Sequence, residues 1–276
     1  MTENTITPAV SAKTPEQMMA ERFRGYYPVV IDVETAGFNA DTDALLEFAA
    51  CTLKFTADGT LVKDQKYCFQ IAPFPGANIE EANIKFIGID PFNPNRQAQD
   101  EKIALVPFFK AIAKAVKKNG CKRAILVGHN AGFDLKFMNA AINRMAYKRS
   151  PFHPFSNIDT ASLGALVLGQ TVLSVSCLTA GLEFDCDQAH GAAYDTDREA
   201  DLFCWFVNRF RELGGWPLPD TMREAAEKAQ ETVNYHRENT ASTEPSAEAS
   251  AEASAEPCVA SSSSAQALEQ DSANNE

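Results

Sequence analysis

The alternation of apolar and polar positions predicts that the fold begins with strands. Residues 27–34, reading YPVVIDVE, alternate and are rich in β-branched side chains, as expected of a strand half-buried in a sheet. Residues 46–55 and 67–72 predict two more strands, joined through a turn at 57–59. Three consecutive strands of this kind predict an antiparallel meander.

The second half of the chain alternates predicted helices with predicted strands. A continuous apolar run at 124–128 predicts a fully buried strand, and residues 157–159 predict a short one. Residues 73–94 are rich in Pro, Asn and Gly and contain no predicted element. The predicted helices are 101–118, 133–147, 160–168, 172–180 and 194–213. Pro107 lies inside the first of them and predicts a delayed start or a kink. This order of elements predicts a three-layer α/β/α domain with a mixed central sheet.

The predicted domain, residues 21–218, lies between two polar ends. Residues 1–20 have no clear period and are expected to form a flexible arm, and 219–235 are compatible with a solvated helix. Residues 236–276 contain a repeat, SAEASAEASAEP, and a serine run. We expect this acidic tail to be disordered, because it has too little apolar surface to offset its ordering entropy.

Composition excludes some classes of protein. The 276 residues are 45% hydrophobic, yet no run approaches the roughly 18 apolar residues of a membrane span. The first residues, MTENTITPAV, lack the pattern of a secretion signal. Seven cysteines without a Cys-x-x-Cys pair indicate neither a disulfide framework nor a zinc site. A reducing cytoplasm is therefore the expected location.

The net charge of −12 does not exclude a polyanionic substrate. From residue 239 to the end there are seven acids and no Lys or Arg, which leaves −5 for the rest of the chain. Metal-binding carboxylates would account for several of the remaining charges. Local clusters of charge are therefore more informative than the total.

Asp32 and Glu34 are the first candidate functional residues. They share one face of the predicted strand 27–34, because side chains alternate with a period of two. Two carboxylates so placed would repel each other and lose hydration, unless a divalent metal lay between them. Alternatively, both lie beyond the strand end, solvated in a loop.

Two later segments supply further candidates. Asp134 opens a predicted helix directly after a buried strand, where the helix N-terminus favours a carboxylate. Taken alone, it also fits a helix-end charge with no other role. Projection at about 100° per residue places Asp195 on the buried side of its helix, whereas Asp197 faces away and is expected to be solvated. His190 precedes Asp195 in the loop entering that helix, where a single histidine is more often structural than catalytic.

Together these residues resemble the three motifs of the DEDD exonucleases. The matching patterns are Asp-x-Glu at 32–34, Asn-x-x-Phe-Asp at 130–134 and His-x-Ala-x-x-Asp at 190–195. The His-x4-Asp spacing indicates the histidine branch, DEDDh. The tyrosine branch requires Tyr-x3-Asp, and Tyr194 is followed at that spacing by Arg198.

The resemblance implies a ribonuclease H-like exonuclease fold and metal-dependent 3′–5′ exonuclease activity. Such enzymes bind two divalent ions, normally Mg²⁺, and Mn²⁺ is the expected substitute. Hard cations of this kind take carboxylate oxygens, and a pair about 3.5–4 Å apart suits in-line phosphoryl displacement. The histidine would act as general base, since an imidazole ordinarily titrates near neutral pH. The implied catalytic and metal residues are Asp32, Glu34, Asp134, His190 and Asp195.

Segments outside the motifs resemble one group of exoribonucleases within this family. The similar segments are 23–47, 88–94, 148–155, 168–174 and 212–218. This group trims the 3′ ends of tRNA, ribosomal RNA and other small stable RNAs, and releases nucleoside 5′-monophosphates. The resemblance implies a substrate RNA with a single-stranded 3′ end, with single-stranded DNA as an artificial substrate.

The same resemblance assigns roles to aromatic and basic residues. Stacking on the terminal bases is implied for Phe38, Phe86, Phe133 and Phe155. A core role stays open for Phe86 and Phe155, whereas the other two neighbour candidate metal ligands. The group forms homodimers, in which a basic patch on one subunit grips the substrate in the active site of the other. The candidates for this patch are Arg22, Arg24, Arg123, Lys148 and Arg149, and ordinary solvated surface is their alternative.

Two other functions compete with this interpretation. A proofreading-type DNA 3′–5′ exonuclease shares the same three motifs. An inactive DEDD domain would instead serve as an RNA-binding module, with the tail recruiting partners. The intact acids and histidine argue against the inactive module.

Overall fold

The computed structural model describes residues 13–241, and for 236–241 it describes the backbone alone. The predictions for most of the arm and the tail therefore lie outside the described residues. The chain divides into two compact units, Met1–Pro217 and Leu218–Glu276.

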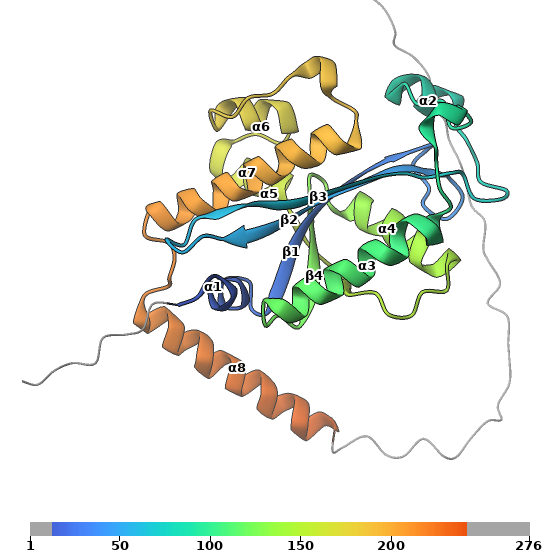
Figure 1. Ribbon diagram of the computed structural model, residues 1–276. Helices are drawn as coiled ribbons and strands as arrows, with labels where there is room; N and C mark the ends of the chain where they lie inside the picture. Colours follow the sequence, from blue (N-terminus) through green and yellow to red (C-terminus); the bar gives the residue numbers. More distant parts are fainter. Residues whose placement is uncertain (1–12, 242–276) are drawn as a thin grey trace, which may run out of the picture. The chain divides into compact units, whose positions relative to one another are not determined.

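A five-stranded mixed sheet forms the centre of the first unit (Figure 1). Its strands are β1 Tyr26–Thr35, β2 Leu45–Phe55, β3 Leu61–Gln70, β4 Arg123–Gly128 and β5 Phe152–Asp159. Their order in the sheet is β3-β2-β1-β4-β5. The first three strands pair antiparallel, whereas β1 with β4 and β4 with β5 pair parallel. The predicted antiparallel meander and mixed sheet are confirmed.

Helices cover both faces of this sheet (Figure 1). One face carries α3, Glu101–Lys118, and α4, Gly132–Arg144. The other carries α5, Thr160–Leu168, α6, Leu173–Thr179, and α7, Ala192–Glu212. The predicted three-layer α/β/α architecture is therefore confirmed, and it explains why Val29, Val30 and Ile31 are all buried.

The core between the sheet and α3 is dominated by aromatic rings. Phe108 of α3 lies edge-on to Phe48 of β2, with ring centroids 5.2 Å apart, and 5.6 Å from its neighbour Phe109. Phe109 in turn packs against Phe152 of β5. Each such pair contributes about 0.5–1.5 kcal/mol beyond its buried area. These contacts tie α3 to strands on both sides of β1, which makes β1 a rigid base for the residues it carries.

Two helices were not predicted. Helix α1, Pro15–Arg22, lies largely within the segment expected to be a flexible arm, and Thr14 and Gln17 form a capping box at its start. Helix α2, Glu81–Ile87, lies within the region rich in Pro, Asn and Gly. Gly88 ends this helix in a left-handed backbone conformation. A glycine is the usual residue at such a helix end, so Gly88 in the sequence was compatible with a helix before it as well as with a loop.

Some element boundaries also differ from the prediction. Strands β3 and β5 begin earlier than expected, at Leu61 and Phe152. Helix α3 begins at Glu101 with Asp100 as its N-cap, so the delayed start expected from Pro107 is wrong. Short 3₁₀ helices occupy Pro94–Arg96 and Cys186–Gln188.

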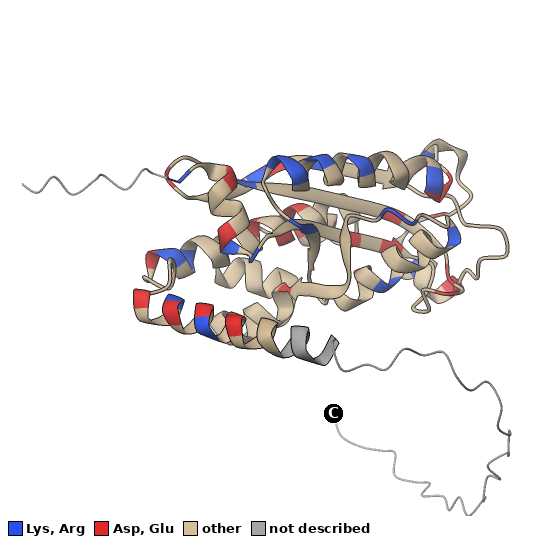
Figure 2. Ribbon diagram, turned by 90° about the horizontal axis from the view of Figure 1, so that it is seen from below, with Lys and Arg blue, Asp and Glu red and all other residues tan. Residues whose placement is uncertain are grey.

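The second unit contains helix α8, Asp220–Ala241. Its side chains are exposed as far as residue 235, and charged residues of both signs occur along it (Figure 2). Within the described residues, no individual helix has the length and apolar character needed to cross a membrane. The bent pair α5 and α6 meets that test only when the two are taken together.

Candidate active site

The site forms around the carboxyl-terminal part of β1. Asp32 and Glu34 lie within the strand, which excludes the alternative that they are solvated in a loop. One oxygen each of Asp32, Glu34 and Asp195 lies within 4.8 Å of the other two, a spacing that fits ligation of one metal ion. The sequence prediction that these three carboxylates converge is thus supported by their geometry.

Asp134 lies next to β1, after the end of β4. The pairing of β4 with β1 stops at Val30, so the following residues of β1 are not paired with β4. Asp134, in the first turn of α4, accepts a hydrogen bond from the Val33 N–H at 3.1 Å. Gly128 makes this approach possible, because a Cβ there would lie 3.0 Å from the Ile31 carbonyl and 3.3 Å from Asp134 Oδ2.

Helix α7 supplies the third segment. Asp195 lies in its first turn and accepts a hydrogen bond from the His190 N–H at 3.0 Å. His190 itself has a left-handed backbone, with φ 64°, which turns the loop into the helix. Its exposed ring packs on Phe86 of α2, with centroids 4.6 Å apart. The loop therefore holds the histidine beside both a carboxylate and an aromatic ring.

Burial makes this set of carboxylates electrostatically unfavourable. Burial, followed by repulsion from Asp195, raises the pKa of Glu34 to about 8, and burial raises that of Asp134 to about 7. Burial and then repulsion from Glu199 raise the pKa of Asp32 well above its ordinary range. Such shifts are typical of functional sites, and the charge of a divalent cation would oppose them by favouring the ionised carboxylates.

Carboxylate oxygens without partners give a further indication of a cation site. Among the described residues, Asp32 Oδ2, Asp195 Oδ1 and Glu199 Oε2 are inaccessible to water and have no hydrogen-bond donor. Native proteins rarely leave such groups unsatisfied. Hard oxygen ligands of this kind suit Mg²⁺ or Mn²⁺, so the donor set fits the metal that the sequence implied.

Glu199 lies at the site, although the helical projection gave it only a place on the buried side of its helix and no role in the chemistry. It is 2% exposed on α7, and its Oε1 accepts a hydrogen bond from the His129 N–H at 3.1 Å. The available signal was its position one helical turn after Asp195, on the same buried face.

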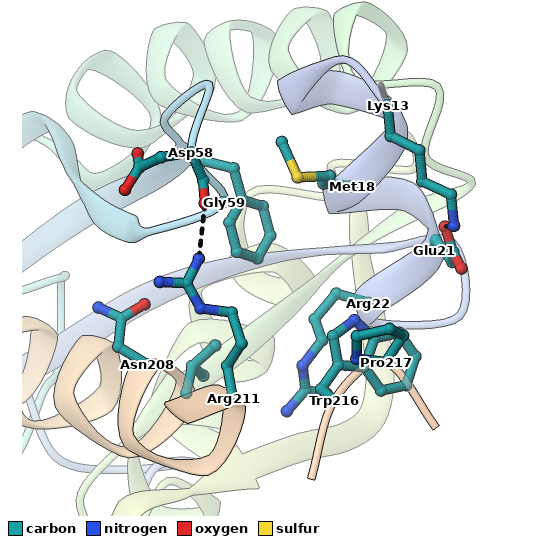
Figure 3. Close-up of a pocket in the computed structure, with 12 residues that line it drawn as sticks. Lys13, Met18, Glu21, Arg22, Asp58, Gly59, Asn208, Arg211, Trp216 and Pro217 are labelled. Carbon is teal, nitrogen blue, oxygen red and sulfur yellow. Dashed lines mark hydrogen bonds and ion pairs between the residues drawn. The ribbon is translucent and has the colours of Figure 1, made fainter. Parts of the chain in front are cut away.

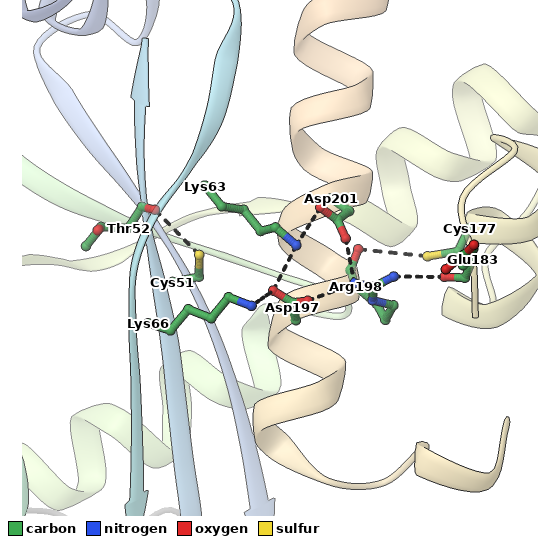
Figure 4. Close-up of polar contacts among 9 residues, drawn as sticks. All are labelled: Cys51, Thr52, Lys63, Lys66, Cys177, Glu183, Asp197, Arg198 and Asp201. Atoms are coloured by element: carbon green, nitrogen blue, oxygen red, sulfur yellow. Dashed lines mark hydrogen bonds and ion pairs between the residues drawn. The ribbon is translucent and has the colours of Figure 1, made fainter. Parts of the chain in front are cut away.

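The prediction for Asp197 is wrong. Its side chain is 17% exposed and forms ion pairs with Lys63, Lys66 and Arg198 (Figure 4). Burial would raise its pKa, but these hydrogen bonds outweigh burial and hold the pKa below its ordinary value. Lys63 also pairs with Asp201, so cations from β3 fill the space next to α7 that the projection assigned to solvent.

The predicted stacking residues differ in their surroundings. Phe38 is 76% exposed in the loop after β1, and its ring lies edge-on to Phe133, at the start of α4 beside Asp134. Phe86 is exposed and contacts His190. Phe155 is exposed and packs on His153. Because the rings of Phe86 and Phe155 are exposed, a role for either in the hydrophobic core is excluded.

The Phe38 loop is firmly held. Buried Asp43 accepts hydrogen bonds from the Asn39 N–H and the Asn78 amide, each at 2.9 Å. Gly37 packs so closely on this carboxylate that a Cβ there would lie 2.1 Å from its Oδ2. An exposed aromatic ring on a fixed loop is an arrangement suited to stacking.

The predicted basic residues lie at the other edge of the sheet. Tyr26 at the start of β1 is the register partner of Arg123, so Arg24 and Arg123 both lie at the strand starts. Exposed Lys148 and Arg149 precede β5 at the same edge. Six residues of strand separate Tyr26 from Asp32, about 20 Å. Within one chain, the basic residues and the carboxylates are therefore far apart.

Arg22 belongs to this edge but is only partly exposed. It stacks on Trp216 at 4.8 Å and on Phe23 at 5.2 Å, and burial lowers its pKa. It lines a cavity of about 340 Å³ together with Arg211, whose guanidinium donates to the Asp58 carbonyl (Figure 3). Its aromatic contacts give Arg22 a packing role that the sequence analysis did not include.

Comparison with known proteins gives consistent matches. The family model described as exonuclease, RNase_T, matches residues 29–203. Ribonuclease T of Photorhabdus laumondii is 57% identical over 212 residues, which cover 77% of this chain and 98% of the relative. Ribonuclease T of Yersinia enterocolitica is 58% identical over 75% of this chain and 96% of its own length. One from an Escherichia coli strain is 58% identical over 73% of this chain and 94% of its own.

Solved structures show the same fold at low identity. Escherichia coli exonuclease I in complex with a dT13 oligonucleotide aligns with a TM-score of 0.53 and 14% identity, over 69% of this chain and 43% of that one. A zinc-bound complex of the same enzyme with single-stranded DNA gives a TM-score of 0.53 and 17% identity, over 69% of this chain and 42% of that one. This chain thus spans less than half of the exonuclease I chain, and the likeness supports the fold alone.

Proposed function

The chain belongs to the ribonuclease T family of exonucleases, and on that premise we propose that it trims the 3′ ends of tRNA and other stable RNAs. It is an exoribonuclease, a hydrolase that acts on nucleic acid. The observation that carries the proposal is the convergence of Asp32, Glu34 and Asp195 oxygens within 4.8 Å, in a site with exposed phenylalanines. The expected site of action is the cytoplasm, which holds these RNAs.

Two Mg²⁺ ions are proposed as cofactors, with Mn²⁺ as a substitute. Asp32, Glu34, Asp134 and Asp195 would hold them, because Glu34 and Asp134 are buried and the other two are half-buried. Oxygens of Asp32, Glu34 and Asp195 also converge, and two of these acids have an oxygen without a partner. When bound, the cations would supply a water nucleophile at neutral pH and stabilise charge on the leaving oxygen. They would also relieve the repulsion that raises the pKa values of these acids.

His190 is proposed as the general base. Its backbone donates to Asp195 and its ring is exposed, so the imidazole is beside the site and open to a substrate water. It would take the proton of the water that attacks the terminal phosphodiester. The products are a nucleoside 5′-monophosphate and an RNA shortened by one residue, with a free 3′-hydroxyl.

Exposed aromatic rings support recognition of an unpaired 3′ end. Phe133 precedes Asp134 in α4 and contacts the ring of Phe38, and Phe86 contacts the ring of His190. A terminal base near the carboxylates would therefore have aromatic rings from separate segments of the chain available for stacking. Every base has a flat face, so stacking binds single strands with little sequence preference. Phe155 is assigned the same role by the resemblance.

A homodimer is proposed to bring the basic edge to the active site. The basic residues at the strand starts of one subunit would bind the RNA whose 3′ end lies in the active site of the other subunit. Within one chain, about 20 Å of strand separates these basic residues from the carboxylates.

Mixing Asp32→Ala protein with an Arg24→Ala/Arg123→Ala double variant tests this arrangement. Each preparation is expected to be nearly inactive, and their mixture is expected to regain activity through hybrid dimers. A mixture as inactive as its components would overturn the arrangement in trans.

The proposed activity is tested with an RNA that has an unpaired 3′ tail. In Mg²⁺, we expect stepwise loss of single nucleotides from the 3′ end, abolished in Asp32→Ala and reduced about 10²–10⁴-fold in His190→Ala. A DNA strand of matched sequence discriminates the proofreading alternative, which predicts faster digestion of DNA than of RNA. Tight RNA binding by the wild type without any cleavage would instead support the inactive module.

A further inference from the structure

Glu199 places a fifth carboxylate against the four acids. It lies one turn after Asp195 on α7 and is 2% exposed. Asp32, Asp134 and Asp195 are all near enough for electrostatic repulsion, and no Lys or Arg among the described residues offsets the charge of Glu199. Its strongest charged neighbour is Asp134, and Glu199 is in turn the strongest charged neighbour of Asp32.

Only one oxygen of this carboxylate is satisfied by the protein. The His129 N–H donates to Oε1, which fixes the side chain against the turn between β4 and α4. Oε2 is inaccessible to water and has no hydrogen-bond partner in the described part of the chain. A buried carboxylate with a free oxygen, beside other carboxylates in the same condition, points to a positively charged ligand.

The position of Glu199 differs from that of Glu34. Glu34 belongs to the group of three acids, with Asp32 and Asp195, whose oxygens lie within 4.8 Å of one another. Glu199 and Asp134 fall outside that group, yet both are close neighbours of Asp32. Asp32 therefore has one set of acidic neighbours for a first cation and another, Asp134 and Glu199, for a second.

We propose that Glu199 helps to hold the second divalent cation, together with Asp32 and Asp134, either as a direct ligand or through one water. This inference rests on the proposed two-cation site and adds a residue to it. The extra negative charge increases affinity for a cation at this position, because the low-dielectric surroundings screen it weakly. The first cation, near Glu34, should depend much less on Glu199.

The competing explanation is that Glu199 is a neutral acid that donates a hydrogen bond to Asp32. Glu199→Gln separates the two. The glutamine amide can still accept from the His129 N–H through its oxygen and donate toward Asp32 through its nitrogen, but it carries no charge. A neutral hydrogen-bonding role would therefore survive this substitution, and a cation-holding role would not.

The experiment is a titration of full-length, metal-free protein with Mn²⁺, with free Mn²⁺ followed by electron paramagnetic resonance. The wild type is expected to bind two ions. In Glu199→Gln we expect the weaker site to lose at least about tenfold in affinity while the tighter site changes little. Glu212→Gln, at the exposed end of the same helix, is the matched control and should bind as the wild type does.

Each outcome bears on the inference. Two unchanged affinities in Glu199→Gln would overturn the role of Glu199 while leaving the two-cation site intact. A wild type that binds no Mn²⁺ would overturn the proposed cofactor itself, and the inference with it. Glu199→Asp, which keeps the charge, is the second variant and should hold the weaker ion better than Glu199→Gln. The opposite order of these two variants would contradict a role for the charge.

Discussion

Glu34→Gln is expected to stabilise the metal-free protein, because it removes a charge that the fold does not compensate. Burial and the neighbouring acids raise the pKa of Glu34 from 4.5 to about 8 in the folded state. Glutamine keeps the shape of the side chain and carries no charge. The substitution should also impair catalysis, so stability and activity would change in opposite directions.

The sign of the pH dependence follows from the raised pKa. Below about pH 4.5 the carboxyl group is protonated in both the folded and the unfolded chain, so it imposes no penalty. As the pH rises toward 8, the unfolded chain releases the proton while the folded chain retains it, and stability falls. By linkage the penalty reaches about 2 kcal/mol at pH 6 and about 4 kcal/mol at pH 8. These are ceilings, because neighbouring carboxylates share the same protons.

The assay is urea unfolding in EDTA at pH 6 and pH 8. The advantage of Glu34→Gln over the wild type in the free energy of unfolding should grow between these two pH values, by up to about 2 kcal/mol. Saturating Mg²⁺ should stabilise the wild type more than the variant, because it neutralises the same charge. Glu212→Gln is the control for the loss of an exposed carboxylate. An advantage that stays constant or shrinks as the pH rises would refute the electrostatic reasoning.

Three further predictions test other parts of the molecule. Lys63→Met removes the cation that links β3 to Asp197 and Asp201, and we expect a loss of about 1 kcal/mol in the free energy of unfolding by urea titration. Phe38→Ala should raise KM for an unpaired RNA end by about 5- to 100-fold with little change in kcat, the equivalent of one stacked base. A chain truncated after Pro217 should keep the wild-type kcat/KM, because residues 1–217 form a compact unit and carry every proposed catalytic residue.

The sequence was most informative where a local pattern decides the structure. Period-two alternation placed Asp32 and Glu34 on β1, and a continuous apolar run located β4 and hence Asp134 at the start of the next helix. These predictions needed no knowledge of distant contacts. The same is true of the mixed sheet, since the order of elements largely determines it.

Two of the failures have a common cause, because each depended on a neighbour from another part of the chain. Asp197 looked solvated on a helical projection, but the projection could not include Lys63 and Lys66, which β3 brings to that side of α7. Glu199 shares the buried side of α7 with Asp195, but the projection could not include the turn after β4, which brings the His129 N–H to its carboxylate. Helix α1 was not predicted for a local reason. Its residues have no clear apolar period, and the capping box at its start was not used as a helix signal.

The hydrogen bonds around the site show how three carboxylates are held in place through one oxygen each, which leaves the second oxygen available for a ligand. Asp134 accepts from the Val33 N–H, Asp195 from the His190 N–H and Glu199 from the His129 N–H. Each donor is a backbone group at a strand edge or in a turn, so each carboxylate is fixed through one oxygen. For Asp195 and Glu199 the other oxygen is left without a partner. A backbone donor adds no charge that would compete with a cation, whereas a Lys or Arg in its place would neutralise the site. The fold thus orients these carboxylates through neutral donors, so that a bound cation is the partner that favours their charged form.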